Sequence, residues 1–124
     1  LSHMVGQPGY LSAGQLKKMQ RDPLVTIGVH GSKHRILTEC TPEEQAEEIF
    51  ASKQVLEKLL GQTCDLFAYS HGQYDDNIRK LTAFAGYRKA FAVAGRPLNA
   101  HFDKGPYAYP RMSVEADTKA MFGL

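Results

Sequence analysis

Two histidines four residues apart, His30 and His34, are the residues whose types and spacing most directly suggest chemistry. They follow a short apolar run, in the stretch VHGSKH, and a polar loop comes after them. Two neutral imidazoles on one turn can share a divalent ion, with a third ligand, normally a carboxylate, from elsewhere. The alternative is two polar loop histidines without a common ligand, because the H-x-x-x-H pattern is short. A helical zincin site is excluded, since Gly31 stands where that motif has glutamate.

Alternating apolar runs and capping signals predict the elements that must position these residues. Ser12 with Gln15 and Thr41 with Glu44 have the spacing of capping boxes, which begin helices. The run at 24–29 is apolar and β-branched at consecutive positions, which is typical of a strand buried on both faces. The predicted order is helix in 10–22, strand 24–29, helix 41–61, strand 64–70, helix 74–86, strand 88–94, strand 107–114 and helix 115–124. This alternation predicts a parallel sheet with right-handed crossovers, open or rolled into a barrel.

In parallel α/β folds ligands bind where strands end and helices have not yet begun. Besides the histidine pair, this rule selects residues 70–75, the loop that contains His101, and Arg111.

Composition limits the class of protein. The 124 residues, 43% of them hydrophobic, suit one globular domain. The net charge is +2 and basic residues alternate with acidic ones, so nucleic acid is a poor candidate partner. No run approaches the roughly 20 apolar residues of a membrane span. Residues 1–4, LSHM, are typical of a cloning scar, so 5–124 is taken as the domain. Cys40 and Cys64 flank a long predicted helix and are expected to be free thiols.

Several ordered features together resemble the polysaccharide deacetylases of the NodB-homology type. They are the H-x-x-x-H pair, the helix TPEEQAEEIFASKQVLEKLLG, the strand FAY leading to a glycine and YD, and AGYRKAF followed by YAYPRM. The resemblance extends from about Val5 to Val114. It implies an incomplete, distorted (β/α) barrel that hydrolyses N-acetyl groups on amino-sugar polysaccharides with bound zinc or a similar ion.

The resemblance also assigns roles to individual residues. His30 and His34 would be two of three protein ligands of the metal. In the family an aspartate completes the set and a second aspartate acts as base, and both lie upstream of everything seen in this chain. The chain is therefore expected to lack the first strands and to be inactive alone.

The remaining family motifs are altered in this sequence. Ser70, His71 and Gly72 stand where the family has Pro-Tyr/Phe-Gly, so the N–H of His71 would be the donor that faces the oxyanion. The arginine that some members carry would fall at Ala68, which leaves Arg111 as the substitute partner for a site carboxylate or as a surface residue. His101 is the remaining candidate for a general acid.

The competing hypothesis is a non-catalytic carbohydrate-binding remnant of the same fold. Its sugar contacts would be aromatic residues that otherwise serve as packing: Tyr69, Tyr74, Tyr107 and Tyr109. Missing strands would leave the edge at 24–29 open, so a homo-oligomer is expected. The resemblance favours an extracytoplasmic, secreted or periplasmic location.

Overall fold

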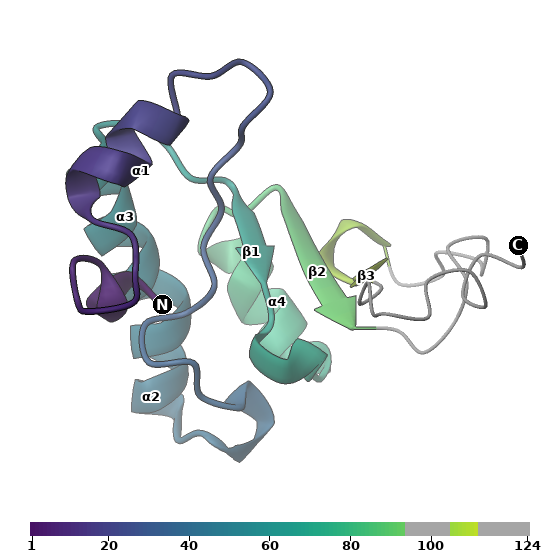
Figure 1. Ribbon diagram of the computed structural model, residues 1–124. Coiled ribbons are helices and arrows are strands. Elements are labelled where there is room, and N and C mark those ends of the chain that lie inside the picture. Colours follow the sequence, from purple (N-terminus) through teal and green to yellow (C-terminus); the bar gives the residue numbers. More distant parts are fainter. Residues whose placement is uncertain (94–104, 112–124) are drawn as a thin grey trace, which may run out of the picture.

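A three-stranded parallel sheet forms the centre of the computed structural model, which describes residues 1–93 and 105–111 (Figure 1). Its strands are β1 (Leu66–Ala68), β2 (Lys89–Val93) and β3 (Tyr109–Arg111), in the order β1-β2-β3. Phe67 lies opposite Ala90, and Ala92 lies opposite Pro110. The strands follow one another in sequence without a reversal of direction across the sheet, as in a barrel rather than a doubly wound sheet. The predicted parallel α/β fold is confirmed.

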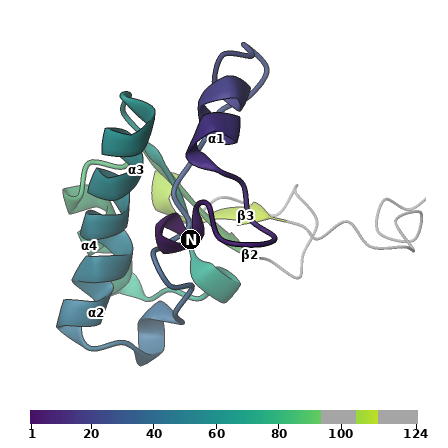
Figure 2. The same ribbon diagram turned by 60° about the vertical axis from the view of Figure 1, so that its left-hand side comes forward.

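Two of the helices begin at the predicted caps, Ser12 and Thr41. The helices are α1 (Ala13–Met19), α2 (Pro42–Ala46), α3 (Ser52–Leu60) and α4 (Asp76–Phe84), and a π-helical turn, Glu47–Ala51, joins α2 to α3. Both predicted capping boxes are present, at Ser12 and at Thr41, and Asp75 caps α4. Figure 2 shows α3 and α4 on the same side of the sheet, as right-handed crossovers between sequential strands require. The π-helical turn was not predicted.

The core lies between this helical layer and the sheet. Phe67 and Ala90 from the strands, with Tyr69 just after β1, pack with Ile49 and Ile78 from the helical layer, and each has an exposed fraction of 1% or less. Since the α2–α3 segment packs here, its apolar stripe has the burial that the sequence predicts.

The segment 24–29 is not the doubly buried strand that its composition predicts. It makes one β-bridge, between Val29 and Phe67, with Val29 N–H donating to Leu66 O and Ala68 N–H donating to Val29 O, both at 2.8 Å. Leu24 is 92% exposed, and only Val29 in this segment is buried. The prediction is wrong because β1 supplies a neighbour on one side only, among the residues that the structure describes.

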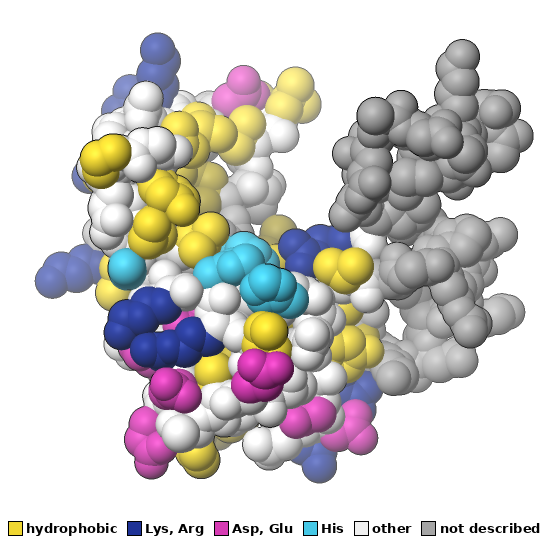
Figure 3. Space-filling model, turned by 60° about the horizontal axis from the view of Figure 1, so that its bottom comes forward, with side chains coloured by type: hydrophobic (Ala, Val, Ile, Leu, Met, Phe, Trp, Pro, Cys, Tyr) yellow, Lys and Arg dark blue, Asp and Glu magenta, His cyan; other side chains and the backbone are white. Residues whose placement is uncertain are grey.

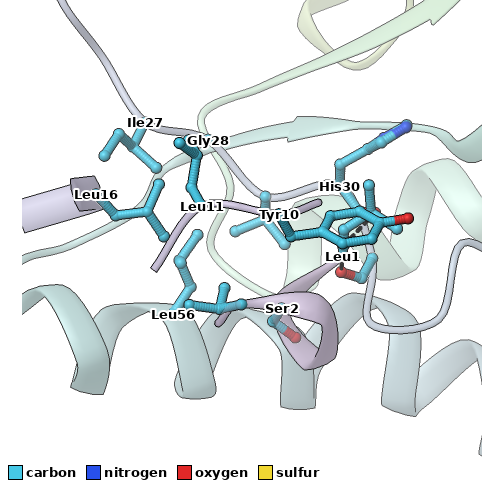
Figure 4. Close-up of a pocket in the computed structure, with 12 residues that line it drawn as sticks. Leu1, Ser2, Tyr10, Leu11, Leu16, Ile27, Gly28, His30 and Leu56 are labelled. Atoms are coloured by element: carbon cyan, nitrogen blue, oxygen red, sulfur yellow. Dashed lines mark hydrogen bonds between the residues drawn. The ribbon is translucent and has the colours of Figure 1, made fainter. Parts of the chain in front are cut away.

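An apolar cavity of about 210 Å³ lies beneath this segment (Figure 4). Leu11, Leu16, Ile27 and Leu56 line it, and His30 lies at its end near Tyr10.

Of the helices in residues 1–93 and 105–111, none is long and apolar enough to cross a membrane. Cys40 and Cys64 are free thiols, as predicted. His101 and the predicted helix 115–124 lie outside the described residues.

Candidate functional site

Three histidines from two separate turns gather in one patch on the molecular surface (Figure 3). The Nε2 atoms of His30 and His34 are 3.1 Å apart, and their ring centroids are 4.8 Å apart. The ring of His71 lies 4.7 Å from that of His34. The sequence predicted that the first two would approach each other, and they do. The third is brought in by the turn after β1.

His30 is oriented by the neighbouring strand. Its Nδ1 lies 2.6 Å from the carbonyl oxygen of Ala68 at the end of β1. A carbonyl can only accept, so Nδ1 carries the proton and Nε2 keeps its lone pair for a ligand. Burial lowers the pKa of His30 below its ordinary value, against the opposing effect of the Ala68 carbonyl, and the nearby His34 and Arg111 lower it further. The ring is therefore held in its neutral, ligating form.

His34 occupies a strained position on the same turn. Its φ of 62° lies in the left-handed region, which is costly for a residue with a side chain. Burial lowers its pKa, and the neighbouring His71 adds to that effect. Strained backbone of this kind is concentrated at functional sites.

A buried glutamate from the helical layer contacts this turn. Glu48 is 1% exposed, and its two carboxylate oxygens accept the N–H groups of Ser32 at 2.9 Å and Lys33 at 2.8 Å. One residue earlier, the partly exposed Glu47 pairs with the side chains of Lys33 at 2.9 Å and Arg35 at 2.6 Å. These two cations lower the pKa of the Glu47 carboxyl.

The role of Glu48 was not predicted from the sequence. The signal was available, because Glu48 precedes Ser52 and Leu56 at intervals of four, which places it on the inward face of the helix.

The turn Ser70–Gly72 carries the third histidine. His71 also has a left-handed φ, of 54°, and its side chain is exposed. Gly72 has φ +70°, and a Cβ there would overlap the backbone N and the Cβ of Val93. Gly72 N–H donates to Tyr69 O, while none of the described residues accepts the N–H of His71.

Arg111 comes close to the same patch from β3, although its hydrogen bonds are not those predicted. Its Nη2 donates to Tyr69 O at 2.9 Å and its Nε lies 3.4 Å from Ala92 O. Within the described ranges no carboxylate pairs with it. Desolvation lowers its pKa. Arg111 thus ties β3 to the end of β1 and adds positive charge near His30.

Two of the tyrosines named as sugar-stacking candidates are packing residues. Tyr69 is fully buried, stacks on Tyr74 with ring centroids 5.0 Å apart, and donates from its hydroxyl to Tyr107 O. Burial raises its pKa to about 12. Tyr109 packs against Phe91, with 5.8 Å between ring centroids. The sugar-stacking interpretation is wrong for Tyr69, since no surface of its ring is accessible.

The carboxylates that the structure describes do not complete the histidine patch. In residues 1–93 and 105–111, no group of three or more His, Cys, Asp or Glu side chains is placed to hold a metal ion. The donor set of His30 and His34, two neutral nitrogens at 3.1 Å, nevertheless fits two positions around one ion. Nitrogens ~2.0–2.1 Å from a tetrahedral ion are ~3.3 Å apart.

Comparison with known proteins gives a consistent result. The sequence model of the polysaccharide deacetylase family matches residues 2–90. YxkH of Bacillus subtilis (strain 168), assigned by name to the polysaccharide deacetylases, is 28% identical over 110 residues, which are 89% of this chain and 38% of that protein.

Solved structures share the fold. The Streptococcus pyogenes deacetylase PplD, solved in complex with acetate, matches with a TM-score of 0.85 and 21% identity over 98% of this chain and 54% of that one. BC0361, a polysaccharide deacetylase from Bacillus cereus, matches with a TM-score of 0.77 and 23% identity over 97% of this chain and 39% of that one. The chain thus spans between 38% and 54% of the length of these three proteins. With the family match covering most of its length, the chain belongs to the polysaccharide deacetylase family.

Proposed function

We propose that this chain supplies the histidine part of a metal-dependent site that deacetylates N-acetylated amino-sugar polysaccharide. The observation that carries the proposal is the 3.1 Å approach of the Nε2 atoms of His30 and His34. A divalent ion such as zinc, bound there, would polarise an acetyl carbonyl and make a water molecule more acidic.

The residues of the chain would bind and orient the reacting groups. His30, with Nδ1 engaged by Ala68, and His34 would offer neutral nitrogens at ordinary pH, because burial lowers the pKa of each. The N–H of His71, which lacks an acceptor among the described residues, is available to donate to a developing oxyanion. Arg111 would add positive charge close to His30.

We further propose that the chain alone does not hydrolyse the acetyl group. A site with two protein ligands binds metal weakly, and the base that takes the water's proton would be a carboxylate that is not engaged elsewhere. The two described carboxylates that contact the 30–34 turn are engaged: Glu48 by two backbone N–H groups, and Glu47 by Lys33 and Arg35.

The test combines metal binding with an assay. Isothermal titration with Zn²⁺ is expected to show one weak site in the full chain that His30→Ala abolishes, while His3→Ala leaves it unchanged. Acetate release from N-acetylated amino-sugar oligomers is expected to stay at the level of free Zn²⁺. A Zn²⁺ site that survives His30→Ala would disprove the metal pair, and turnover that depends on His30 would disprove the inactivity.

Self-association is proposed from the segment 24–29. Its single bridge leaves backbone donors such as those of Ile27 and Gly28 without partners in the described part of the chain, next to the apolar cavity. A second copy could pair with this edge. Sedimentation at micromolar concentration should show a dimer or larger species that Ile27→Lys weakens, whereas a monomer at all concentrations would contradict it.

A further inference from the structure

The side chain of Glu48 holds the turn between the two histidines by binding the main chain of that turn, not its side chains. Each carboxylate oxygen accepts one of two successive N–H groups, those of Ser32 and Lys33. Burial of a carboxylate is unfavourable unless hydrogen bonds replace the lost water, and Glu48 is 1% exposed. Its two hydrogen bonds to the turn compensate for that burial, so the buried carboxylate and the shape of the turn depend on each other.

The turn is shaped to receive a carboxylate. Gly31 has φ +70°, and this left-handed residue points the N–H groups that follow it toward the same side, forming an anion-binding concavity. A Cβ at position 31 would overlap Glu48 Oε2, so only glycine permits this approach. His30 and His34 are the residues at the two ends of the turn so fixed.

The π-helical turn aims Glu48 at this concavity. Ser52 N–H donates to Glu47 O, a bond to the fifth preceding residue that inserts one extra residue into the helix. Side chains accommodate the disturbed carbonyls: the Ser52 hydroxyl donates to Glu48 O, and the Tyr87 hydroxyl donates to Ile49 O at 2.7 Å. The hydroxyl of Tyr87, which lies just before β2, therefore helps to hold the insertion. The extra residue turns the Glu48 side chain about the helix axis relative to its direction in a regular α-helix.

We propose that Glu48 is the positioning residue of the histidine pair: its bidentate grip on the 32–33 backbone sets the approach of His30 and His34 that metal binding requires. The proposal rests on the proposed function for its metal-binding consequence. Charge alone does not account for the arrangement, because Arg35 lies 3.7 Å from Glu48 but makes its 2.6 Å bond to Glu47.

The test compares two isosteric substitutions in the full chain. Glu48→Gln replaces one acceptor oxygen by a donor NH₂, so only one of the two N–H groups keeps its partner. Glu47→Gln, one residue away, removes the same charge but touches only the Lys33 and Arg35 side chains. Each variant is titrated with Co²⁺ alone, followed by visible absorption, after its urea unfolding transition has shown that it is folded.

Glu48→Gln is expected to weaken Co²⁺ binding about tenfold or more, as loss of a group that orients metal ligands generally does. Glu47→Gln should change the Kd less than about twofold, because an exposed ion pair contributes little. Gly31→Ala, which displaces Oε2 from the other side, should weaken binding in the same sense as Glu48→Gln. Folded Glu48→Gln and Gly31→Ala variants with wild-type Kd values would overturn the proposal.

A metal-free measurement separates this proposal from the proposed function. Nuclear Overhauser contacts between the His30 and His34 rings, and the amide proton shifts of Ser32 and Lys33, are recorded without metal. If the wild-type chain shows no His30-dependent Co²⁺ binding, the proposed function is wrong. The contacts between the two rings, measured without metal, still decide the role of Glu48. Their loss in Glu48→Gln supports positioning, and their persistence refutes it. Glu48→Asp, which keeps the charge but is one methylene shorter, replaces Glu48→Gln if that variant does not fold.

Discussion

The two turns that bring the histidines together are held by different means. The 30–34 turn is held by a side chain, the buried carboxylate of Glu48, which a helix insertion aims at it. The Ser70–Gly72 turn is held by backbone: Gly72 N–H donates to Tyr69 O, and Val93 lies so close that a Cβ at Gly72 would overlap its backbone N. Each nevertheless places one histidine in the left-handed region. Similar local strain can thus be maintained by a replaceable side chain or by the main chain, and the two should respond differently to substitution.

The largest expected effect comes from adding a methyl group at the glycine of each turn. Both glycines have φ +70°, so alanine costs each about 1–2 kcal/mol of left-handed strain. At Gly72 the new Cβ meets the backbone of Val93, which cannot move away, so Gly72→Ala should lower the free energy of unfolding by about 3 kcal/mol in total. At Gly31 it meets the end of the Glu48 side chain, which can move, so Gly31→Ala should cost less. Urea unfolding followed by circular dichroism measures both; equal losses would remove the distinction between the turns.

A smaller loss of stability is expected from substitution of Tyr87, which contacts the 30–34 turn only indirectly, through the π-helical turn that carries Glu48. Tyr87→Phe removes the hydroxyl that donates to Ile49 O in the π-helical turn, and loss of this buried hydrogen bond should lower the free energy of unfolding by about 1 kcal/mol. Tyr10→Phe, at a side chain that is 48% exposed, is the matched control and should be close to neutral. Amide shifts of Ser32 and Lys33 should move in Tyr87→Phe while those of Gly72 stay in place. A shift at Gly72 instead would contradict the assignment of this support to one turn.

Relief of the left-handed backbone strain at a histidine should raise the free energy of unfolding by about 1 kcal/mol. His71→Gly removes the left-handed penalty at an exposed side chain, so the free energy of unfolding should rise by about that amount. His34→Gly removes the same penalty but also the ring that packs against His30, so its gain should be smaller. Thermal or urea unfolding of the two variants side by side tests this, and destabilisation by His71→Gly would show that the backbone there is not strained.

The smallest expected effect is the pH dependence of the free energy of unfolding, which arises from the two histidines of the 30–34 turn. Burial lowers the folded-state pKa of His30 and His34 below 6.5, so the unfolded chain takes up protons first as the pH falls. The free energy of unfolding should therefore decrease as the pH drops through 6.5 and level off below the folded-state pKa values. Urea unfolding between pH 7.5 and 5.5 should show this slope, reduced in His30→Gln. An unchanged slope in that variant would assign the dependence to other groups.

Much of the fold follows from local sequence. Ser12 and Thr41 cap helices where they were expected to, because a capping side chain and its backbone donor are at most three residues apart. The parallel order followed from strand-helix alternation, since a crossover helix leaves few chiral options. The prediction of a doubly buried strand at 24–29 was wrong for the complementary reason. Strand pairing depends on neighbours distant in sequence, and the composition of a segment does not say how many neighbouring strands it has.

The histidine pair was visible in the sequence because both members lie on one turn. Their spacing of four residues predicted that His30 and His34 could approach each other, and the order of motifs placed the chain in its family. The approach of His71, the use of Arg111 as a tie to the Tyr69 and Ala92 carbonyls, and the seat provided by Glu48 were decided only by the tertiary structure. Each joins segments between 15 and 42 residues apart, where contact is set by how helices and strands pack and not by any local preference. The π-helical turn belongs with these: the hydroxyl of Tyr87, 38 residues from Ile49, donates to one of its carbonyls, so the insertion depends on a contact distant in sequence.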